Sequence, residues 1–127
     1  MLMGRITGTV VSTQKDDGMR GFKLVTVQNV DLGMVTTPTY TVAVDAVGAG
    51  VGELVIVVQG SSARLTEATR NRPIDAAVVC IVDTVDLGGR VVYDKREDGL
   101  APAARVEPVP AFAPVAAASA AGAARTA

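Results

Sequence analysis

Histidine is absent from this 127-residue chain, and cysteine occurs once, at Cys80. Without imidazole the chain lacks the most common general base and zinc ligand, and one thiol cannot form an intramolecular disulfide. Cys80 lies within an apolar run, so we expect an inert, buried thiol rather than a nucleophile. These shortages argue against an enzyme, a cofactor and a bound metal.

Aromatic residues and net charge are also scarce. The chain has two Tyr, two Phe and no Trp, and its formal net charge is -1. Binding of nucleic acid normally uses a positive surface with stacking aromatics, and neither is present in quantity. Apolar runs stay well short of the roughly 18 residues that span a membrane, and the N-terminus does not resemble a secretory signal. We therefore expect a soluble, cytoplasmic protein with no nucleic-acid or membrane partner.

What the chain does have is a succession of β-branched segments separated by Gly and Asp clusters, which is typical of short strands. The pattern predicts strands at residues 2–13, 22–31, 39–45, 53–59 and 76–85, and a final edge strand at 90–93. Ser62 is expected to cap a short helix from Ala63 to Asn71 that Pro73 ends. Because closure removes exposed sheet edges, we expect an all-β fold, a small five-stranded OB-like barrel with one short helix.

The composition changes sharply near residue 100. Residues 101–127 contain 13 Ala and 4 Pro, so few large side chains remain to offset the entropy of ordering the segment. We expect a barrel domain at residues 1–95 and a disordered, flexible Ala/Pro-rich tail at residues 96–127.

The fourth predicted strand is apolar on both faces. Leu54, Ile56 and Val58 alternate with Val55 and Val57, and residues 77–82 form another unbroken apolar run. A small barrel has one interior, so the second apolar face needs a cover. A neighbouring subunit is one cover, with Val55 and Val57 at the contact, and this predicts an obligate oligomer. A loop or the tail of the same chain is the alternative.

Several segments invite a functional interpretation that the surrounding sequence weakens. The glycines of residues 48–52 suggest a phosphate loop, but a strand follows them, so a tight turn or a close subunit contact is favoured. Ser61 and Ser62 have no base to activate them and suit a polar lining or subunit contact. Scattered aspartates at strand and turn ends are ordinary turn residues rather than a metal site.

Six segments taken together resemble the EutN/CcmL family of bacterial microcompartment vertex proteins. They follow one another in order over residues 1 to about 86, with family-like spacing: GTVVSTQK at 8–15, GFKL at 21–24, VAVD at 42–45, GAGVGE at 48–53, GSSAR at 60–64 and PIDAA at 73–77. Cys80 departs from the resemblance, since a smaller residue is expected there, and so does the segment from Asp94 onward.

The resemblance implies a five-stranded OB-like barrel that assembles into a pentamer at the five-fold corners of a polyhedral shell. Its partners would be copies of itself and the hexameric and pseudohexameric proteins that tile the facets. The five-fold axis and pore are expected at two loops, with contributions from Gly48, Ala49, Gly50, Ser61, Ser62 and Arg64. Lys15 and Lys23 are expected to join Val55 and Val57 at the subunit interface.

Other functions remain open beside a structural shell protein. A small-molecule or ion gate would use Ser61 or Ser62 to line an axial channel, and bulky replacements there would change the flux. An OB-fold binder of single-stranded nucleic acid would retain a strand in a gel shift at low salt. An enzyme has the least support, because no nucleophile and base are placed together.

Overall fold

The structure is a computed structural model that describes residues 1–98, so the predicted tail lies outside the described residues from residue 99 onward. Five strands form a closed barrel, and two more form a separate hairpin. The elements in chain order are β1 (Leu2–Val10), the 3₁₀ helix η1 (Asp17–Met19), β2 (Leu24–Val30), β3 (Thr36–Asp45), β4 (Leu54–Gln59), the 3₁₀ helix η2 (Gly60–Arg64), β5 (Ala76–Ile81), β6 (Thr84–Leu87), β7 (Arg90–Asp94) and α1 (Lys95–Asp98).

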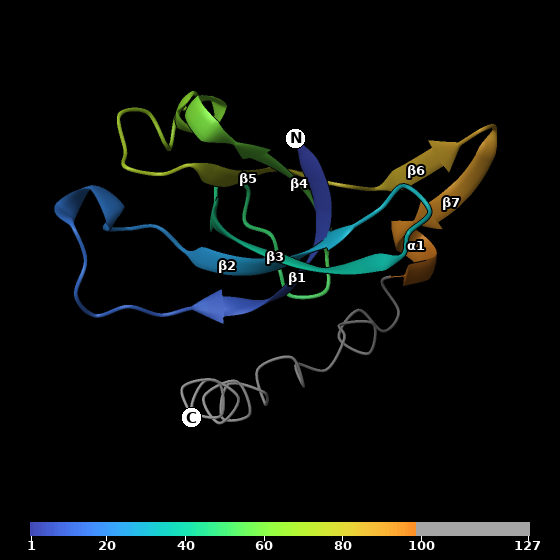
Figure 1. Cartoon of the computed structure of the whole chain (residues 1–127), viewed down its shortest axis with the longest axis horizontal. Coiled ribbons are helices and arrows are strands. Elements are labelled where there is room, and N and C mark those ends of the chain that lie inside the picture. The colour runs from blue at the N-terminus through green and yellow to red at the C-terminus, as the bar shows by residue number, and fades with distance from the viewer. Residues whose placement is uncertain (99–127) are drawn as a thin grey trace, which may run out of the picture.

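The barrel closes in the order β1-β2-β3-β5-β4, with β4 returning to pair with β1 (Figure 1). Neighbouring strands are antiparallel except β3 and β5, which pair in parallel at Val44 and Ala77. Closure occurs where Leu2 lies opposite Val57. The expected all-β fold with a small five-stranded barrel is confirmed, although β3 pairs with β5 only at Val44 and Asp45, so the rest of that edge of β3 has no strand partner among residues 1–98.

Small apolar side chains fill the barrel because alternate residues of each strand point inward. Val25 and Val27 from β2 meet Val55 and Val57 from β4, and all four side chains are fully buried. The remaining members of this central cluster are Ile6, Ala43, Ala49, Ala76 and Val78. Valine and alanine suit so narrow a barrel, since larger inward side chains would not fit at native packing density.

The predicted strand 76–85 is wrong in its second half. β5 ends at Ile81, and the chain leaves the barrel to form the hairpin of β6 and β7, which pair only with each other. The predicted edge strand at 90–93 is therefore half of this hairpin. We call residues 84–94 the arm.

The predicted helix from Ala63 to Asn71 is also wrong. The structure has η2 at Gly60–Arg64, followed by turns. A continuing α-helix would use the Ala63 carbonyl for a backbone N–H four residues later, but the buried Thr69 hydroxyl donates to that carbonyl over 2.6 Å. Asn71 then adopts a positive φ of 58°, which no right-handed helix contains. The α-helix of the described chain is instead α1.

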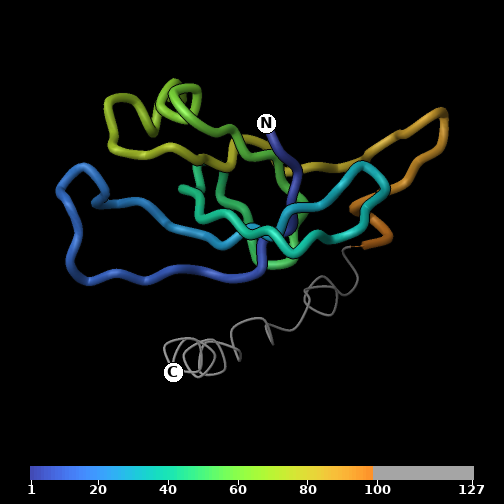
Figure 2. The backbone as a smooth tube through the Cα atoms, viewed as in Figure 1, coloured from blue at the N-terminus to red at the C-terminus, as the bar shows by residue number. Residues whose placement is uncertain are grey.

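The described chain is elongated. The arm extends from one end of the barrel, while η1 and the turns after η2 lie at the opposite end (Figures 1 and 2). We call residues 10–23 together with 60–75 the loop end. These two ends therefore project in opposite directions from the barrel.

Candidate functional site

The glycine loop at residues 48–52 connects β3 to β4 and is built on a side-chain turn. One carboxylate oxygen of Asp45 accepts the backbone N–H groups of Val47 and Gly48, each over 3.0 Å. Gly48 and Gly52 take positive φ angles of 76° and 91°, which L side chains rarely adopt. Ala49 between them is buried in the central cluster. The loop therefore closes one end of the barrel.

The backbone N–H groups of all three glycines in this loop donate hydrogen bonds within the chain, which weakens the case for a phosphate loop. Gly50 N–H donates to Glu53 Oε2 over 2.7 Å, and Gly52 N–H donates to the Ile6 carbonyl over 2.8 Å. A recess of about 450 Å³ lies beside the loop, and Glu53, Lys95 and Asp98 are among the residues that line it. The two carboxylates are paired with Lys95 and Arg5, so these cations are already neutralised within the chain and the geometry supports the tight-turn interpretation.

A buried ion pair fastens α1 to the same loop. The Arg5 guanidinium donates to Asp98 Oδ2 over 2.7 Å and to the Gly52 carbonyl over 2.8 Å. The side chains of Arg5 and Asp98 are only 10% and 8% exposed. The same guanidinium stacks over the Tyr93 ring, 5.7 Å from its centroid. Burial, with the Asp98 charge nearby, raises the pKa of Tyr93 against the opposing effect of Arg5.

A second, more exposed ion pair reinforces this contact. Lys95 Nζ lies 2.9 Å from Glu53 Oε1. Burial on its own would raise the pKa of Glu53, but the Gly50 N–H hydrogen bond and Lys95 outweigh it and lower the pKa below 4.5. The hydrogen bond to Glu53 in turn raises the pKa of Lys95 above 10.5. Both groups are therefore charged at neutral pH, and β4, α1 and the loop are held together.

The predicted pore residues of η2 lie on an exposed turn. Ser61, Ser62 and Arg64 face solvent, whereas Ala63 is fully buried. The Ser62 hydroxyl donates to the Gln59 carbonyl over 2.8 Å, and Arg64 donates to the Ile74 carbonyl over 3.0 Å. These contacts tie the turn to the end of β4 and to the segment that precedes β5. Their role at a five-fold axis stays a prediction.

The two predicted axis loops are not brought together within one chain. The glycine loop precedes β4 and η2 follows it, so the six residues of that strand separate them. At roughly 3.3 Å per residue the separation is about 20 Å. Gly48, Ala49 and Gly50 therefore cannot form the same constriction as Ser61, Ser62 and Arg64.

Lys15 and Lys23, predicted at the subunit interface, make contacts within the chain. Lys15 Nζ donates to the Ser12 carbonyl, and Lys23 Nζ donates to the Ala49 carbonyl, over 2.8 and 2.9 Å. Lys23 also lies 3.8 Å from Asp45 Oδ2, so it supports the base of the glycine loop. Both lysines remain on the surface, and their intersubunit role stays a prediction.

Val55 and Val57 were predicted at the subunit interface, and this is wrong. Both side chains are 0% exposed in the single chain, because they point into the barrel. The alternation of β4 puts Leu54, Ile56 and Val58 outside instead. A neighbouring subunit cannot reach the inward-facing valines.

The second apolar face of β4 is covered largely by the chain itself, which was the alternative to an oligomer. Tyr93 of the arm packs with Leu54, and Ala63 and Ile74 pack with Val58. Ile56 between them stays partly exposed. The two-faced strand is therefore not in itself a reason for an oligomer, and that physical argument from the sequence is wrong.

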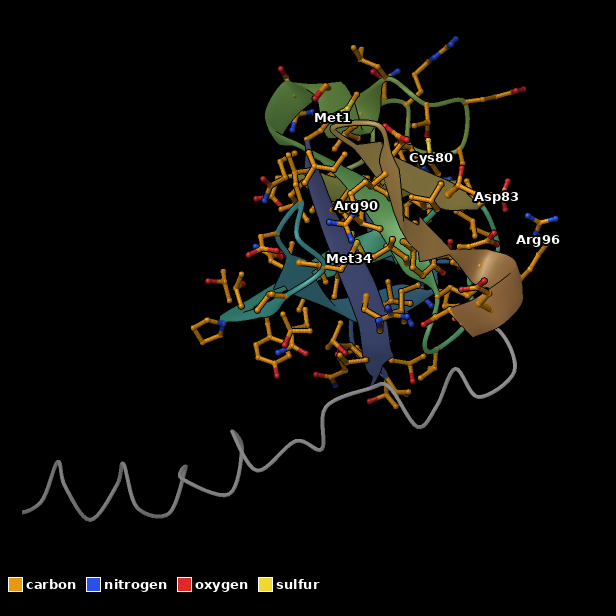
Figure 3. The ribbon with its side chains drawn as sticks, turned by 90° about the vertical axis from the view of Figure 1, so that its right-hand side faces the viewer. Met1, Met34, Cys80, Asp83, Arg90 and Arg96 are labelled. Atoms are coloured by element: carbon orange, nitrogen blue, oxygen red, sulfur yellow. The ribbon has the colours of Figure 1, made fainter. Side chains whose placement is uncertain are left out.

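Cys80 was predicted to be buried, and it is exposed on β5 (Figure 3). It lies opposite Ile56 in the register of β4 and β5. The prediction failed because a register shift in the pairing of β4 and β5 places Cys80 opposite the outward-facing Ile56, although Val78 two residues earlier points into the barrel.

Residues 1–98 contain no group of three or more His, Cys, Asp or Glu side chains arranged to hold a metal ion. Helices in this part of the chain are too short or too polar to cross a membrane.

Two features of the site were missed in the sequence. The Arg5–Asp98 contact joins residues 93 positions apart, and only the polar Arg5 within an apolar strand hinted at a buried partner. The arm was hidden because residues 76–85 read as one strand. Asp83 was the available signal, since a charged residue interrupts the apolar run where the chain leaves the barrel.

Comparison with known proteins gives consistent matches. Residues 1–83 match the family described as "Ethanolamine utilisation protein EutN/carboxysome". The carboxysome shell vertex protein CcmL of Synechococcus elongatus is 46% identical over 97 residues, which covers 76% of this chain and 98% of that protein.

Solved structures agree with the sequence matches. The structure of Gloeobacter violaceus CcmL superposes with a TM-score of 0.74 at 44% identity, covering 76% of this chain and 99% of that one. The GrpN pentameric microcompartment shell protein from Rhodospirillum rubrum superposes with a TM-score of 0.63 at 47% identity, covering 68% of this chain and 100% of that one.

Proposed function

The chain belongs to the EutN/CcmL family, and from this membership we propose that it forms homopentamers that cap the five-fold vertices of a polyhedral bacterial microcompartment. The protein would reside in the shell of that compartment. Its role is architectural, so the relevant chemistry is the shape and the contacts of its subunits.

One observation carries the proposal. The match to a carboxysome shell vertex protein at 46% identity extends over 98% of that protein, so the whole length of the relative has a counterpart here. The closed barrel and the overlay on CcmL show that this counterpart also has the same fold. The pentameric state is supported by GrpN, whose solved structure is described as pentameric.

A ring of five explains how such a protein performs its work. A head-to-tail contact between identical subunits closes into a ring when its rotation is one fifth of a turn. Hexagonal units alone tile a flat sheet, and a five-fold unit removes one wedge and forces the sheet to curve. We propose hexameric and pseudohexameric shell proteins as the neighbours of the ring.

We propose no catalytic activity. The relatives are named for a place in a shell, and the polar groups around the glycine loop are committed to structural contacts. The small-molecule gate lacks a specific observation in its favour, since the Ser62 hydroxyl donates to the Gln59 carbonyl of its own turn.

The test has two parts. Sedimentation equilibrium of the full chain is expected to give five times the 13.0 kDa mass of one chain. In bacteria that make hexameric shell proteins but lack a vertex protein, expression of this chain is expected to convert open or elongated shells into closed polyhedra by electron microscopy. A chain that stays monomeric at micromolar concentration and leaves the shells open would overturn the proposal.

A further inference from the structure

The recess beside the glycine loop has a wall that suits an apolar side chain. Glycines of the loop contribute only backbone atoms to this wall, while Val51 and Tyr93 contribute apolar side chains. Val51 is 45% exposed, so part of its side chain is available for a further contact. Binding recesses in proteins are lined mainly by apolar groups with a few polar ones, and this recess has that character.

The charged groups of the recess do not require a charged ligand. Glu53 pairs with Lys95 over 2.9 Å, and Asp98 pairs with the Arg5 guanidinium over 2.7 Å. Each of these charges therefore has a partner of opposite sign within the chain. A lysine side chain also offers its methylene groups to an apolar neighbour while its charged end stays in water. The occupant that fits this recess is aliphatic and uncharged.

The described chain ends at the same recess. Asp98, the last residue of α1, lines it, and so does Lys95, the first residue of α1. The next two residues in the sequence are Gly99 and Leu100. Two residues span at most about 7 Å, so the recess is within the reach of Leu100. Leu100 is also the first large apolar residue after α1.

The order of these residues matches a common way of ending a helix. A glycine directly after a helix often adopts a left-handed φ, and the apolar residue that follows it packs back on the last turn of the helix. For Leu100 the residue that receives this contact is Lys95, at the start of that turn. Because Lys95 lines the recess, the pattern directs Leu100 to the place that the chain can reach.

We propose that the recess beside the glycine loop is the docking site of this chain's own C-terminal segment, with Leu100 as the side chain that enters it. Gly99 turns the chain, and Leu100 contacts Val51 and the methylene groups of Lys95. This contact adds an apolar component to the ion pairs that hold α1, and it fixes the point at which residues 101–127 leave the barrel. It is made within one chain, so it does not depend on the proposed pentamer.

The first experiment asks whether Leu100 contributes to stability. Leu100→Asp is compared with Val106→Asp, which adds the same charge to the same segment but beyond Pro102. Thermal melting of the full chain is measured at one protein concentration, because assembly makes stability depend on concentration. Leu100→Asp is expected to lower the melting temperature by several degrees, and Val106→Asp is expected to leave it unchanged. Equal melting temperatures for wild type and Leu100→Asp would overturn the proposal.

The second experiment locates the contact with a disulfide. Val51→Cys and Leu100→Cys are combined in a Cys80→Ser background and oxidised in air. The expected product is a single chain closed by a disulfide, which migrates faster than the reduced chain on a denaturing gel. The control pairs Leu100→Cys with Val42→Cys, since Val42 is exposed on β3 and does not line the recess. The control is expected to oxidise much more slowly.

Two outcomes of the disulfide experiment would count against the proposal. Equal rates of oxidation in the two pairs would show that Leu100 has no preference for the recess. Disulfides that form only between chains would assign the recess to Leu100 of a second copy and overturn docking within one chain. Neither outcome affects the proposed function, because sedimentation equilibrium of wild type tests the pentamer separately.

Discussion

The guanidinium of Arg5, in the first strand, lies 2.7 Å from the carboxylate of Asp98, at the end of α1, and both side chains are about nine-tenths buried. This contact fixes the end of the described chain onto the glycine loop, because Arg5 also binds the Gly52 carbonyl. Removing one partner of a buried pair leaves the other charge without compensation.

Asp98→Ala is therefore expected to lower the free energy of unfolding by about 3 kcal/mol. Urea unfolding at one fixed protein concentration measures it, since assembly makes stability depend on concentration. The matched control is Asp94→Ala, whose partner Arg96 is exposed. That change is expected to cost much less, because solvent screens the charges of an exposed pair. If the two variants lose the same free energy of unfolding, the buried pair contributes no more to stability than the exposed pair.

Glu53 predicts a specific pH dependence of stability. Its pKa in the folded protein lies below 4.5, because the Gly50 N–H and Lys95 outweigh the effect of burial. A lowered folded pKa contributes stability that is present above the unfolded pKa and is lost as the pH falls through the folded value. Wild type is therefore expected to be more stable than Glu53→Gln at pH 7, and the difference is expected to shrink below about pH 4.5. A difference in the free energy of unfolding between the two proteins that stays constant from pH 7 to pH 3 would contradict this expectation.

Gly4 is required by the close approach of β1 and β2. A Cβ atom there would lie 2.7 Å from the Gln28 carbonyl oxygen, which belongs to the backbone of the paired strand and cannot move aside freely. Gly4→Ala is expected to destabilise the barrel by about 1–3 kcal/mol, the usual cost of overpacking. Gly50→Ala is the control, since the nearest atom to its Cβ would be Glu53 Oε2 at 3.9 Å. Thermal melting compares the two, and equal melting temperatures would contradict the steric argument.

The barrel was predictable because its signal is local. Alternating β-branched residues and the turns between them place five strands, and the EutN/CcmL resemblance adds the way they close. The arm was harder to predict, because the one local signal that the chain leaves the barrel after Ile81 is a single charged residue, Asp83. The helix after Ser62 was wrong for a different reason: the Thr69 hydroxyl donates to the Ala63 carbonyl six residues earlier, and this side-chain hydrogen bond competes with the helical one.

The site was predicted less well than the fold. Residues 48–52 and 60–64 were predicted as two loops at the five-fold axis, but their placement at opposite ends of β4 requires the topology. Val55 and Val57 were assigned to the wrong face because periodicity shows that two faces exist and not which one is inside. Only the partners across the barrel, such as Val25 and Val27, decide that question.

That choice of face can be tested at two neighbouring positions of β4. Val57→Lys puts an unpaired charge inside the barrel, at a cost of several kcal/mol, comparable with the total stability of about 5–15 kcal/mol for a small domain. It is expected to abolish the cooperative thermal transition and yield insoluble protein. Ile56→Lys is expected to keep a folded barrel, because its side chain lies on the outer face and the charged end can reach water. Circular dichroism and soluble yield measure both variants. A Val57→Lys variant that keeps a folded barrel and only separates into single subunits would contradict the inward position of Val57. That result would support the original prediction that Val57 lies at the subunit interface.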